Sequence, residues 1–255
     1  MSILEIVFIL IICSIFALIT YRKGMLDVGG SVTAFFIGAV LGFFGGIWWI
    51  FLLLVFLASA FLATRYKFQY KRSKGVQEGS KGERGFINVL ANGSVPVIIA
   101  LFHAPPDGNN ILGLGLLEHK LAVFLFITAV ACAASDTLAS EMGILSDRTY
   151  LITNGKRVPA GTNGGISLLG QLWALFGSFY TFLVAFFVFH FICSISLSYS
   201  WVVLGISMGF VSCQFDSVLG AAFERKGLLG KSSVNMTAIA LSITITGVIL
   251  WLMAY

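Results

Sequence analysis

The chain contains eight apolar runs, each close to the length of about 20 residues that a helix needs to cross a bilayer. Of its 255 residues, 58% are hydrophobic and only 11% are charged, whereas soluble proteins average about 25% charged. These properties exclude an ordinary soluble domain and predict a single all-α, polytopic membrane bundle of about eight transmembrane helices. The expected spans are Ile3–Thr20, Gly29–Ile47, Trp48–Thr64, Phe86–His103, Leu121–Ser140, Ile166–Phe189, Tyr199–Phe223 and Val234–Met253.

The basic residues gather on one side of this arrangement. With eight spans, every Lys and Arg except Lys120 falls on the same face. Because Lys- and Arg-rich loops remain in the cytoplasm, this pattern predicts a cell-membrane protein with that face in the cytoplasm and both termini outside. The connector Ala104–Glu118, on the opposite face, is short and turn-rich. We therefore expect the chemistry at the cytoplasmic face.

The sequence also carries a faint internal duplication. Gly29-Gly30-Ser31-Val32 and Gly164-Gly165-Ile166-Ser167 each open a helix, and in both halves a later helix begins near an Asn. Both openings start from the cytoplasmic face, which predicts a parallel repeat of four plus four helices, in residues 1–110 and 118–255. The alternative is coincidence, because glycine is common in membrane helices.

Three carboxylates lie near the cytoplasmic ends of apolar spans: Asp136, Glu141 and Asp216. An ionisable group there costs at least about 2.5 kcal/mol unless it faces protein, water or a metal. Five residues of helix turn by about 500°, which places Asp136 and Glu141 about 140° apart around the helix axis. They share a ligand only if the helix loosens near Gly143, and otherwise they serve two neighbouring sites. Carboxylates from separate helices suit Mg²⁺. Hydrogen bonding to Ser or Thr, or pairing with Lys or Arg, is the alternative.

The loop Leu151–Ile166 is the clearest anion-binding candidate. Lys156 and Arg157 supply positive charge, and the glycines of Gly161–Gly165 let backbone amides approach a phosphate just before a helix N-terminus. The pattern G-x-x-x-x-G-K-[ST] is absent from the sequence, which disfavours a P-loop ATPase.

A second basic loop, Arg65–Arg84, ends in Lys81 and Arg84 and leads into a helix that carries Asn88 and Asn92 on one face. The loop could cradle phosphates, or it could set the topology by attracting anionic lipid headgroups. The two amides could bind a ligand or form an interhelical hydrogen-bonded clasp. We expect no nucleic-acid partner, and the sequence is compatible with an oligomer.

At these residues the chain resembles the phytyl-phosphate kinase and transmembrane-protein-19-like family of integral membrane proteins. The resemblance runs from about Gly29 to the C-terminus. Two departures are a Gln expected where Asn88 stands and a second Pro expected where Ala160 stands. The matching segments are VLANG at Val89–Gly93, SDTLASEMG at Ser135–Gly143, GTNGGIS at Gly161–Ser167 and DSVLGA at Asp216–Ala221.

The resemblance implies a Mg²⁺-dependent transfer of a phosphoryl group from CTP to an isoprenoid monophosphate of the phytyl or geranylgeranyl type. A more distant likeness to CDP-diacylglycerol synthases and polyprenol kinases points to the same use of CTP and Mg²⁺. On this hypothesis Asp136, Glu141 and Asp216 hold the metal. The nucleotide phosphates are expected on Lys156, Gly161, Thr162, Asn163, Gly164, Gly165 and Ser167, and the acceptor phosphate on Lys81, Arg84, Asn88 and Asn92.

Two other functions fit part of the pattern. A membrane transporter or lipid flippase would also use a repeat and intramembrane carboxylates, but its site should lie near mid-bilayer. A membrane cytidylyltransferase would use CTP and Mg²⁺ in the same way but transfer a different group. The depth of the carboxylates separates the transporter from the two enzymes.

Overall fold

The computed structural model describes residues 2–104 and 114–254. Six of its helices are long and apolar enough to cross a membrane, and α2 and α5 are shorter apolar helices, so the predicted helical membrane bundle is confirmed. Residues 105–113 of the connector predicted to be turn-rich lie outside the described residues. The helices are α1 (Ile3–Arg22), α2 (Val28–Phe44), α3 (Ile47–Arg65), α4 (Phe68–Ser73), α5 (Phe86–Phe102), α6 (His119–Gly143), α7 (Leu168–Ala185), α8 (Tyr199–Ala222) and α9 (Lys231–Ala254).

Local sequence signals account for several helix ends. The side chain of Asp27 accepts a hydrogen bond of 2.6 Å from the Gly30 N–H and so begins α2. Helices α2 and α3 are separated only by Gly45 and Gly46, and Gly46 adopts φ +92°, which a residue with a side chain rarely does. Two short elements complete the helical set: η1 (Phe186–Ile192) continues α7 as a π-helix, and η2 (Glu224–Lys226) follows α8.

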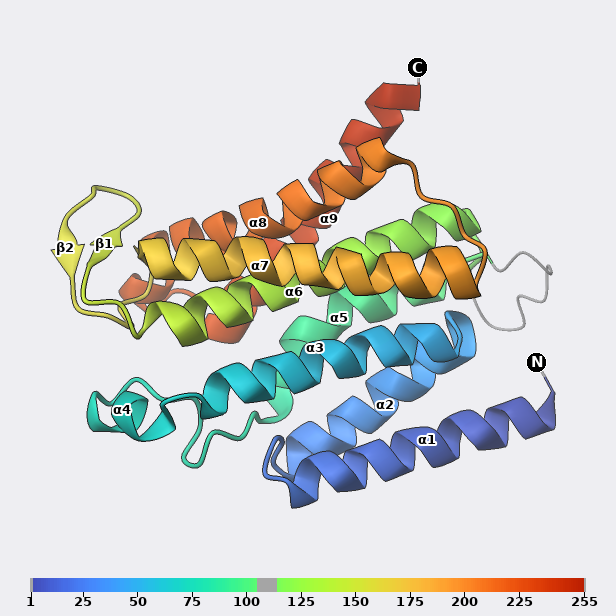
Figure 1. Ribbon diagram of the computed structural model, residues 1–255, viewed down its shortest axis with the longest axis horizontal. Helices are drawn as coiled ribbons and strands as arrows, with labels where there is room; N and C mark the ends of the chain where they lie inside the picture. Colours follow the sequence, from blue (N-terminus) through green and yellow to red (C-terminus); the bar gives the residue numbers. More distant parts are fainter. Residues whose placement is uncertain (1, 105–113, 255) are drawn as a thin grey trace.

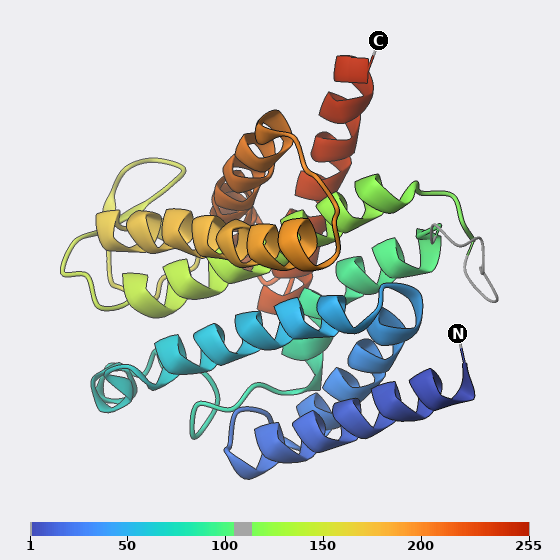
Figure 2. The same cartoon turned by 45° about the vertical axis from the view of Figure 1, so that its right-hand side comes forward.

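Helix α6 is the central element of the bundle (Figures 1 and 2). In its most hydrophobic 18-residue window 89% of the residues are buried, against 17 to 44% in the other long helices. It packs most extensively against α7, where glycines allow close approach. A Cβ added to Gly177 would lie 2.9 Å from the Ala134 carbonyl oxygen, and one added to Gly170 would lie 3.2 Å from that of Ala139. The two backbones are therefore in direct contact.

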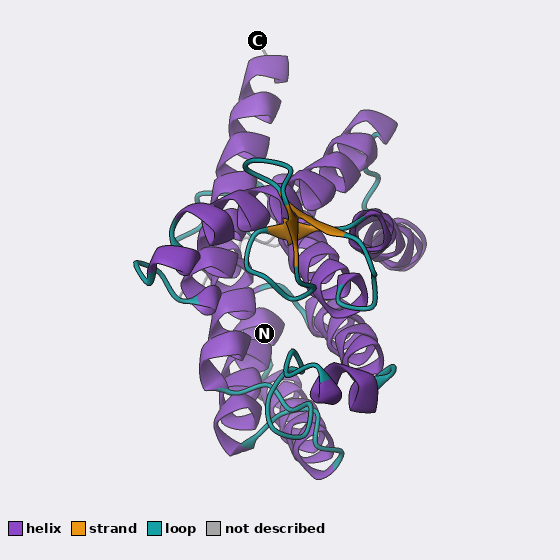
Figure 3. Cartoon of the chain, turned by 90° about the vertical axis from the view of Figure 1, so that its left-hand side faces the viewer, coloured by secondary structure: helices purple, strands orange, loops and turns teal. Residues whose placement is uncertain are grey.

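The loops at the basic end of the bundle are more structured than the sequence predicts. In the segment expected to be a loop, three short strands form an antiparallel sheet in the order β2-β1-β3: β1 (Thr149–Leu151), β2 (Arg157–Val158) and β3 (Gly165–Ile166). The sheet and α4 lie at one end of the bundle, and the N-terminus lies at the other (Figures 1 and 3). The segment is too short for a periodic pattern, and its pairing depends on the turns around it.

The proposed four-plus-four repeat stays a prediction. Helix α2 packs extensively along α5 in the first half, whereas α7, its counterpart in the second half, packs mainly on α6 and α8. The two corresponding helices, α2 and α7, thus pack on different neighbours.

Replacing Gly177 by Ala should destabilise the protein, because the new methyl group would press on the backbone of α6. We expect a loss of about 1–3 kcal/mol, the usual cost of overpacking a tight core. Gly247→Ala in α9 is the matched control, because a Cβ there meets nothing within 4 Å. Thermal unfolding in detergent measures both. Equal stability of the two variants would contradict the close α6–α7 contact.

Candidate functional site

A polar cavity of about 270 Å³ opens where α6, α8 and α9 approach the loop between β2 and α7. This volume is close to the lower end, roughly 300 Å³, of small-molecule sites. Helix α6 contributes Asp136 and Ser140, α8 contributes Asp216, and α9 contributes Lys231 and Asn235. The predicted segment Gly161–Ser167 forms the facing wall. The structure therefore brings together two of the predicted carboxylates and the predicted glycine loop.

The carboxyl groups of Asp136 and Asp216 interact with each other across the α6–α8 contact. The side-chain amide of Asn235 donates a hydrogen bond of 3.2 Å to Asp136. Glu224, two turns after Asp216 along the chain, also lines the cavity and interacts with Asn163 of the glycine loop. Three carboxylates thus face a small space in an otherwise apolar bundle, where their mutual repulsion favours a bound cation.

The glycine loop lies directly against α8. A Cβ on Gly164 would come within 2.7 Å of the Ala221 backbone nitrogen, and Gly164 also adopts φ +76°, so only glycine fits there. The loop is fixed by pairing of β3 with β1 and by a hydrogen bond of 3.0 Å from the Ile152 N–H to the Gly164 carbonyl. Ser167 caps α7 by accepting from the Gly170 N–H at 3.1 Å.

Several polar atoms on the cavity wall are buried without a hydrogen-bond partner among the described residues. They are Gln77 Oε1, Thr149 Oγ1 and Asp216 Oδ2. A buried polar atom without a partner costs about 1–3 kcal/mol. Three such atoms around one cavity indicate a polar ligand that would complete their hydrogen bonds.

Lys231 is the basic residue that the sequence reasoning missed. Its ammonium lies 2.9 Å from Glu78 and interacts electrostatically with Asp136. Burial raises the pKa of Glu78, but the neighbouring ammonium outweighs burial and holds that pKa below its usual value, so the carboxylate is charged at neutral pH. The usable signal was the spacing of Lys231 and Asn235, four residues apart at a helix start.

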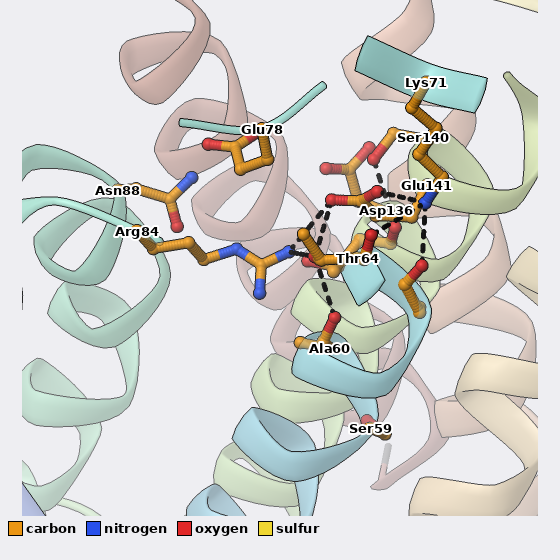
Figure 4. A network of polar contacts seen from close by, with 12 residues as sticks. Ser59, Ala60, Thr64, Lys71, Glu78, Arg84, Asn88, Asp136, Ser140 and Glu141 are labelled. Atoms are coloured by element: carbon orange, nitrogen blue, oxygen red, sulfur yellow. Dashed lines mark hydrogen bonds and ion pairs between the residues drawn. The ribbon is translucent and has the colours of Figure 1, made fainter. Parts of the chain in front are cut away.

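Glu141 lies outside this cavity, in a buried cluster that Figure 4 shows in detail. Its carboxylate accepts a hydrogen bond of 2.7 Å from Thr64 and pairs with Lys71 at 2.7 Å and with Arg84 at 3.5 Å. Helix α6 stays regular through Gly143, so Asp136 and Glu141 face two neighbouring sites. Pairing with cations, the alternative considered for these carboxylates, is what the structure has at Glu141.

The other predicted basic residues are placed differently from one another. Lys156 is exposed in the turn between β1 and β2 and does not line the cavity, because strand pairing directs that turn away from α8. Lys81 is also exposed. Arg84 is buried, and two backbone hydrogen bonds to Met25 and Asp27, of 3.0 and 3.1 Å, fix its position.

Asn88 and Asn92 lie beside Arg84 at one end of a second, smaller cavity of about 50 Å³ between α2, α3 and α5. The side-chain amide of Asn92 donates a hydrogen bond of 2.9 Å to the backbone carbonyl of Asn88. The side-chain oxygen Asn92 Oδ1 is buried without a partner among the described residues. The structure thus brings three of the four predicted acceptor-site residues together.

Among the described residues, no group of three or more His, Cys, Asp or Glu side chains has the geometry of a complete metal site. Mg²⁺ is usually held by one or two carboxylates together with water and substrate phosphates. The donor set of Asp136 and Asp216 fits that pattern, with substrate oxygens supplying the remaining ligands.

Comparison with known proteins assigns the chain to a family. The model of the integral membrane protein family DUF92 matches residues 11–250. The chain belongs to this family. An uncharacterised membrane protein of Methanocaldococcus jannaschii is 33% identical over 248 residues, which cover 97% of this chain and 92% of the relative. No solved structure matches.

Two plant relatives of this DUF92 protein connect it to the resemblance found in the sequence. Protein PGR of Arabidopsis thaliana is 30% identical over 233 residues, covering 88% of this chain and 80% of that protein. The chloroplastic protein VTE6 of the same plant is 34% identical over 119 residues, covering 46% of this chain and 34% of that protein. The resemblance to the phytyl-phosphate kinase family is confirmed.

Replacing Glu141 by Gln should destabilise the protein strongly, because Lys71 and Arg84 would stay buried without their counter-charge. Breaking one side of a buried ion pair costs about 3–5 kcal/mol. Glu78→Gln is the control, because its partner Lys231 has a side chain that is 53% exposed, and exposed pairs contribute at most about 1 kcal/mol. Thermal unfolding in detergent tests the difference. A small, equal effect in both variants would show that Glu141 does not hold the cluster together.

Proposed function

We propose that this DUF92 protein is a CTP-dependent kinase that phosphorylates an isoprenoid monophosphate at the cytoplasmic face of the membrane. The observation that carries the proposal is the cavity in which Asp136, Asp216 and the glycine loop meet around unpartnered polar atoms. Phosphoryl transfer needs mainly positioning and neutralisation of charge, and this cavity offers both. Family membership supports the reaction class, and the cluster of basic loops at one end supports the cytoplasmic orientation.

On the nucleotide side, Asp136 and Asp216 would hold Mg²⁺, which neutralises phosphate charge when bound. The backbone N–H groups of the glycine loop would contact phosphate oxygens. The N–H groups of Thr162 and Gly165 already donate within the loop, which leaves Asn163 and Gly164 as the donors facing α8. Lys231 would supply the cation near the phosphates, the role that the sequence assigned to Lys156.

On the acceptor side, Arg84 with Asn88 and Asn92 would hold the monophosphate. An oxygen of that phosphate attacks the γ-phosphorus of CTP, the bond from the γ-phosphorus to the β–γ bridging oxygen breaks, and CDP leaves while the acceptor becomes a diphosphate. The acceptor is already an anionic nucleophile, so the step needs no general base. Glu141, positioned through Thr64, Lys71 and Arg84, would act as a positioning residue for Arg84.

The depth of the cavity favours the kinase over a transporter. Asp136 lies seven residues before the end of α6, and Lys231 is the first residue of α9. The cavity therefore sits at the sheet-bearing end of the bundle, whereas a transporter binds its substrate near mid-bilayer.

Asp136→Asn and Asp216→Asn should each abolish most Mg²⁺-dependent transfer from CTP to a prenyl monophosphate. Loss of one oriented electrostatic contact alone lowers rates by roughly 10²–10³. Both variants should fold, because neutralising a carboxylate in an apolar bundle lowers its desolvation cost. Turnover of purified protein in nanodiscs, with CTP compared against ATP, GTP and UTP, measures the effect, and thermal unfolding checks the fold.

Lysine variants provide the matched control. Lys231→Ala should raise the KM for CTP by about tenfold, equivalent to about 1.4 kcal/mol, whereas Lys156→Ala, in an exposed turn, should change it less. Activity in both aspartate variants at the parental level would refute the kinase proposal. A larger effect at Lys156 than at Lys231 would place the nucleotide on the outer side of the glycine loop.

A further inference from the structure

The small cavity between α2, α3 and α5 has two chemically different parts. Its walls are apolar and come from Leu26, Ala34, Ile37, Leu53, Phe56, Leu57, Ala60, Val89 and Gly93. Its polar members are Asn88 and Asn92, in the first two turns of α5, and Arg84, two residues before that helix begins. Asn88 lies beside Arg84 in Figure 4. We call this cavity the α2–α5 groove.

At the polar end, Lys71 and Arg84 are two buried cations that share one ion-pair partner among the described residues, Glu141. The Lys71 ammonium lies 2.7 Å from that carboxylate and the Arg84 guanidinium lies 3.5 Å from it, so Arg84 is the more weakly paired of the two. Glu78 and Asp136 interact with Arg84 only at longer range. A buried guanidinium without a close carboxylate of its own favours an anion.

Arg84 has donors available for that anion. Among the described residues its side chain donates to Thr64 at 3.1 Å and to Glu141 at 3.5 Å, and Nη2 makes both hydrogen bonds. A guanidinium has five N–H donors in a planar fork, so Nε and Nη1 remain for a bidentate contact with a phosphate.

The apolar part of the groove runs from this charge into the bundle. From Asp27, beside Arg84, to Ile37 on α2 is ten residues, or about 15 Å of helix at 1.5 Å per residue. A ligand that matches both parts of the groove has an anionic head and an apolar chain next to it. Arg84 also interacts electrostatically with Asp136, so the head would lie close to the polar cavity.

We propose that the α2–α5 groove binds the first part of the hydrocarbon chain of an anionic lipid phosphate whose headgroup lies on Arg84. This inference rests on the proposed function for the identity of the lipid, an isoprenoid monophosphate. It adds the place where the chain is held and predicts that selectivity for chain length depends on residues of α2 and α3.

The test uses the full-length protein in nanodiscs and a farnesyl monophosphate whose tail carries a diazirine. Irradiation followed by peptide mapping should place the label on groove residues such as Ile37, Phe56 and Leu57. Ala34→Leu, which fills the groove, should reduce this labelling at least tenfold. Val32→Leu is the matched control on the same helix, because Val32 is 52% exposed on the outer surface of α2 and should leave the labelling unchanged.

Kinase turnover measured on the same samples separates the two proposals. We expect Ala34→Leu to raise the KM for farnesyl monophosphate at least tenfold and to leave that for the short dimethylallyl monophosphate unchanged. Groove labelling without any turnover would reject the kinase proposal and retain the groove as a lipid-phosphate site. If the parent protein turns over farnesyl monophosphate but is labelled only outside the groove, the proposal that the groove binds the lipid chain is wrong. This outcome does not depend on whether Ala34→Leu folds.

Discussion

Burial of most of α6 forces nearly every polar group on that helix to find a partner inside the protein. In the apolar interior an unpaired carboxylate costs several kcal/mol, so neither Asp136 nor Glu141 can simply face lipid. The Glu141 carboxylate accepts a hydrogen bond from Thr64 and forms ion pairs with Lys71 and Arg84. Asp136 accepts a hydrogen bond from Asn235 and has a second carboxylate, Asp216, beside it. The same constraint thus produces a closed cluster on one face of α6 and an incomplete one on the other.

The incomplete cluster is where the molecule departs from ordinary packing. Two carboxylates repel each other, and the atoms around them that lack partners, Gln77 Oε1 and Thr149 Oγ1, belong to segments from different parts of the chain. A divalent cation with phosphate oxygens would resolve part of this, since the metal neutralises the carboxylates and a phosphate oxygen accepts a hydrogen bond from the Thr149 hydroxyl. The Gln77 carbonyl oxygen needs a donor instead, such as a hydroxyl or amino group of the nucleotide. The closed cluster holds Arg84, which lines the α2–α5 groove and interacts electrostatically with Asp136 in the cavity. On the proposed function, α6 would therefore take part in binding both substrates.

Much of this organisation could be predicted from the sequence, because the length of an apolar run and the spacing of glycines can be recognised without knowing which residues are in contact. The eight apolar helices follow from hydrophobic length, and the position of the GTNGG loop just before a helix, where it lines the cavity, follows from glycine spacing. The 100° rotation per residue offered two neighbouring sites for Asp136 and Glu141 as one of two options. The metal role assigned to Glu141 does not fit the structure, because its carboxylate is paired with Lys71 and Arg84 outside the cavity. The role of Lys71 could not be predicted, because a lysine in a basic loop has the same local sequence whether it is exposed or, like Lys71, buried against a carboxylate 70 residues away. The small sheet was missed for a similar reason, since strands of two or three residues carry no periodic pattern.

The central claim is that the cavity between α6, α8, α9 and the glycine loop holds the metal–nucleotide phosphates. Its most direct test is an experimental structure of the protein in nanodiscs with Mg²⁺ and a non-hydrolysable CTP analogue. The account predicts the metal at about 2.0–2.1 Å from carboxylate oxygens of Asp136 and Asp216, with the phosphates against the backbone of Asn163 and Gly164. Nucleotide density at the exposed basic loop, with the cavity between Asp136 and Asp216 left without metal, would contradict it.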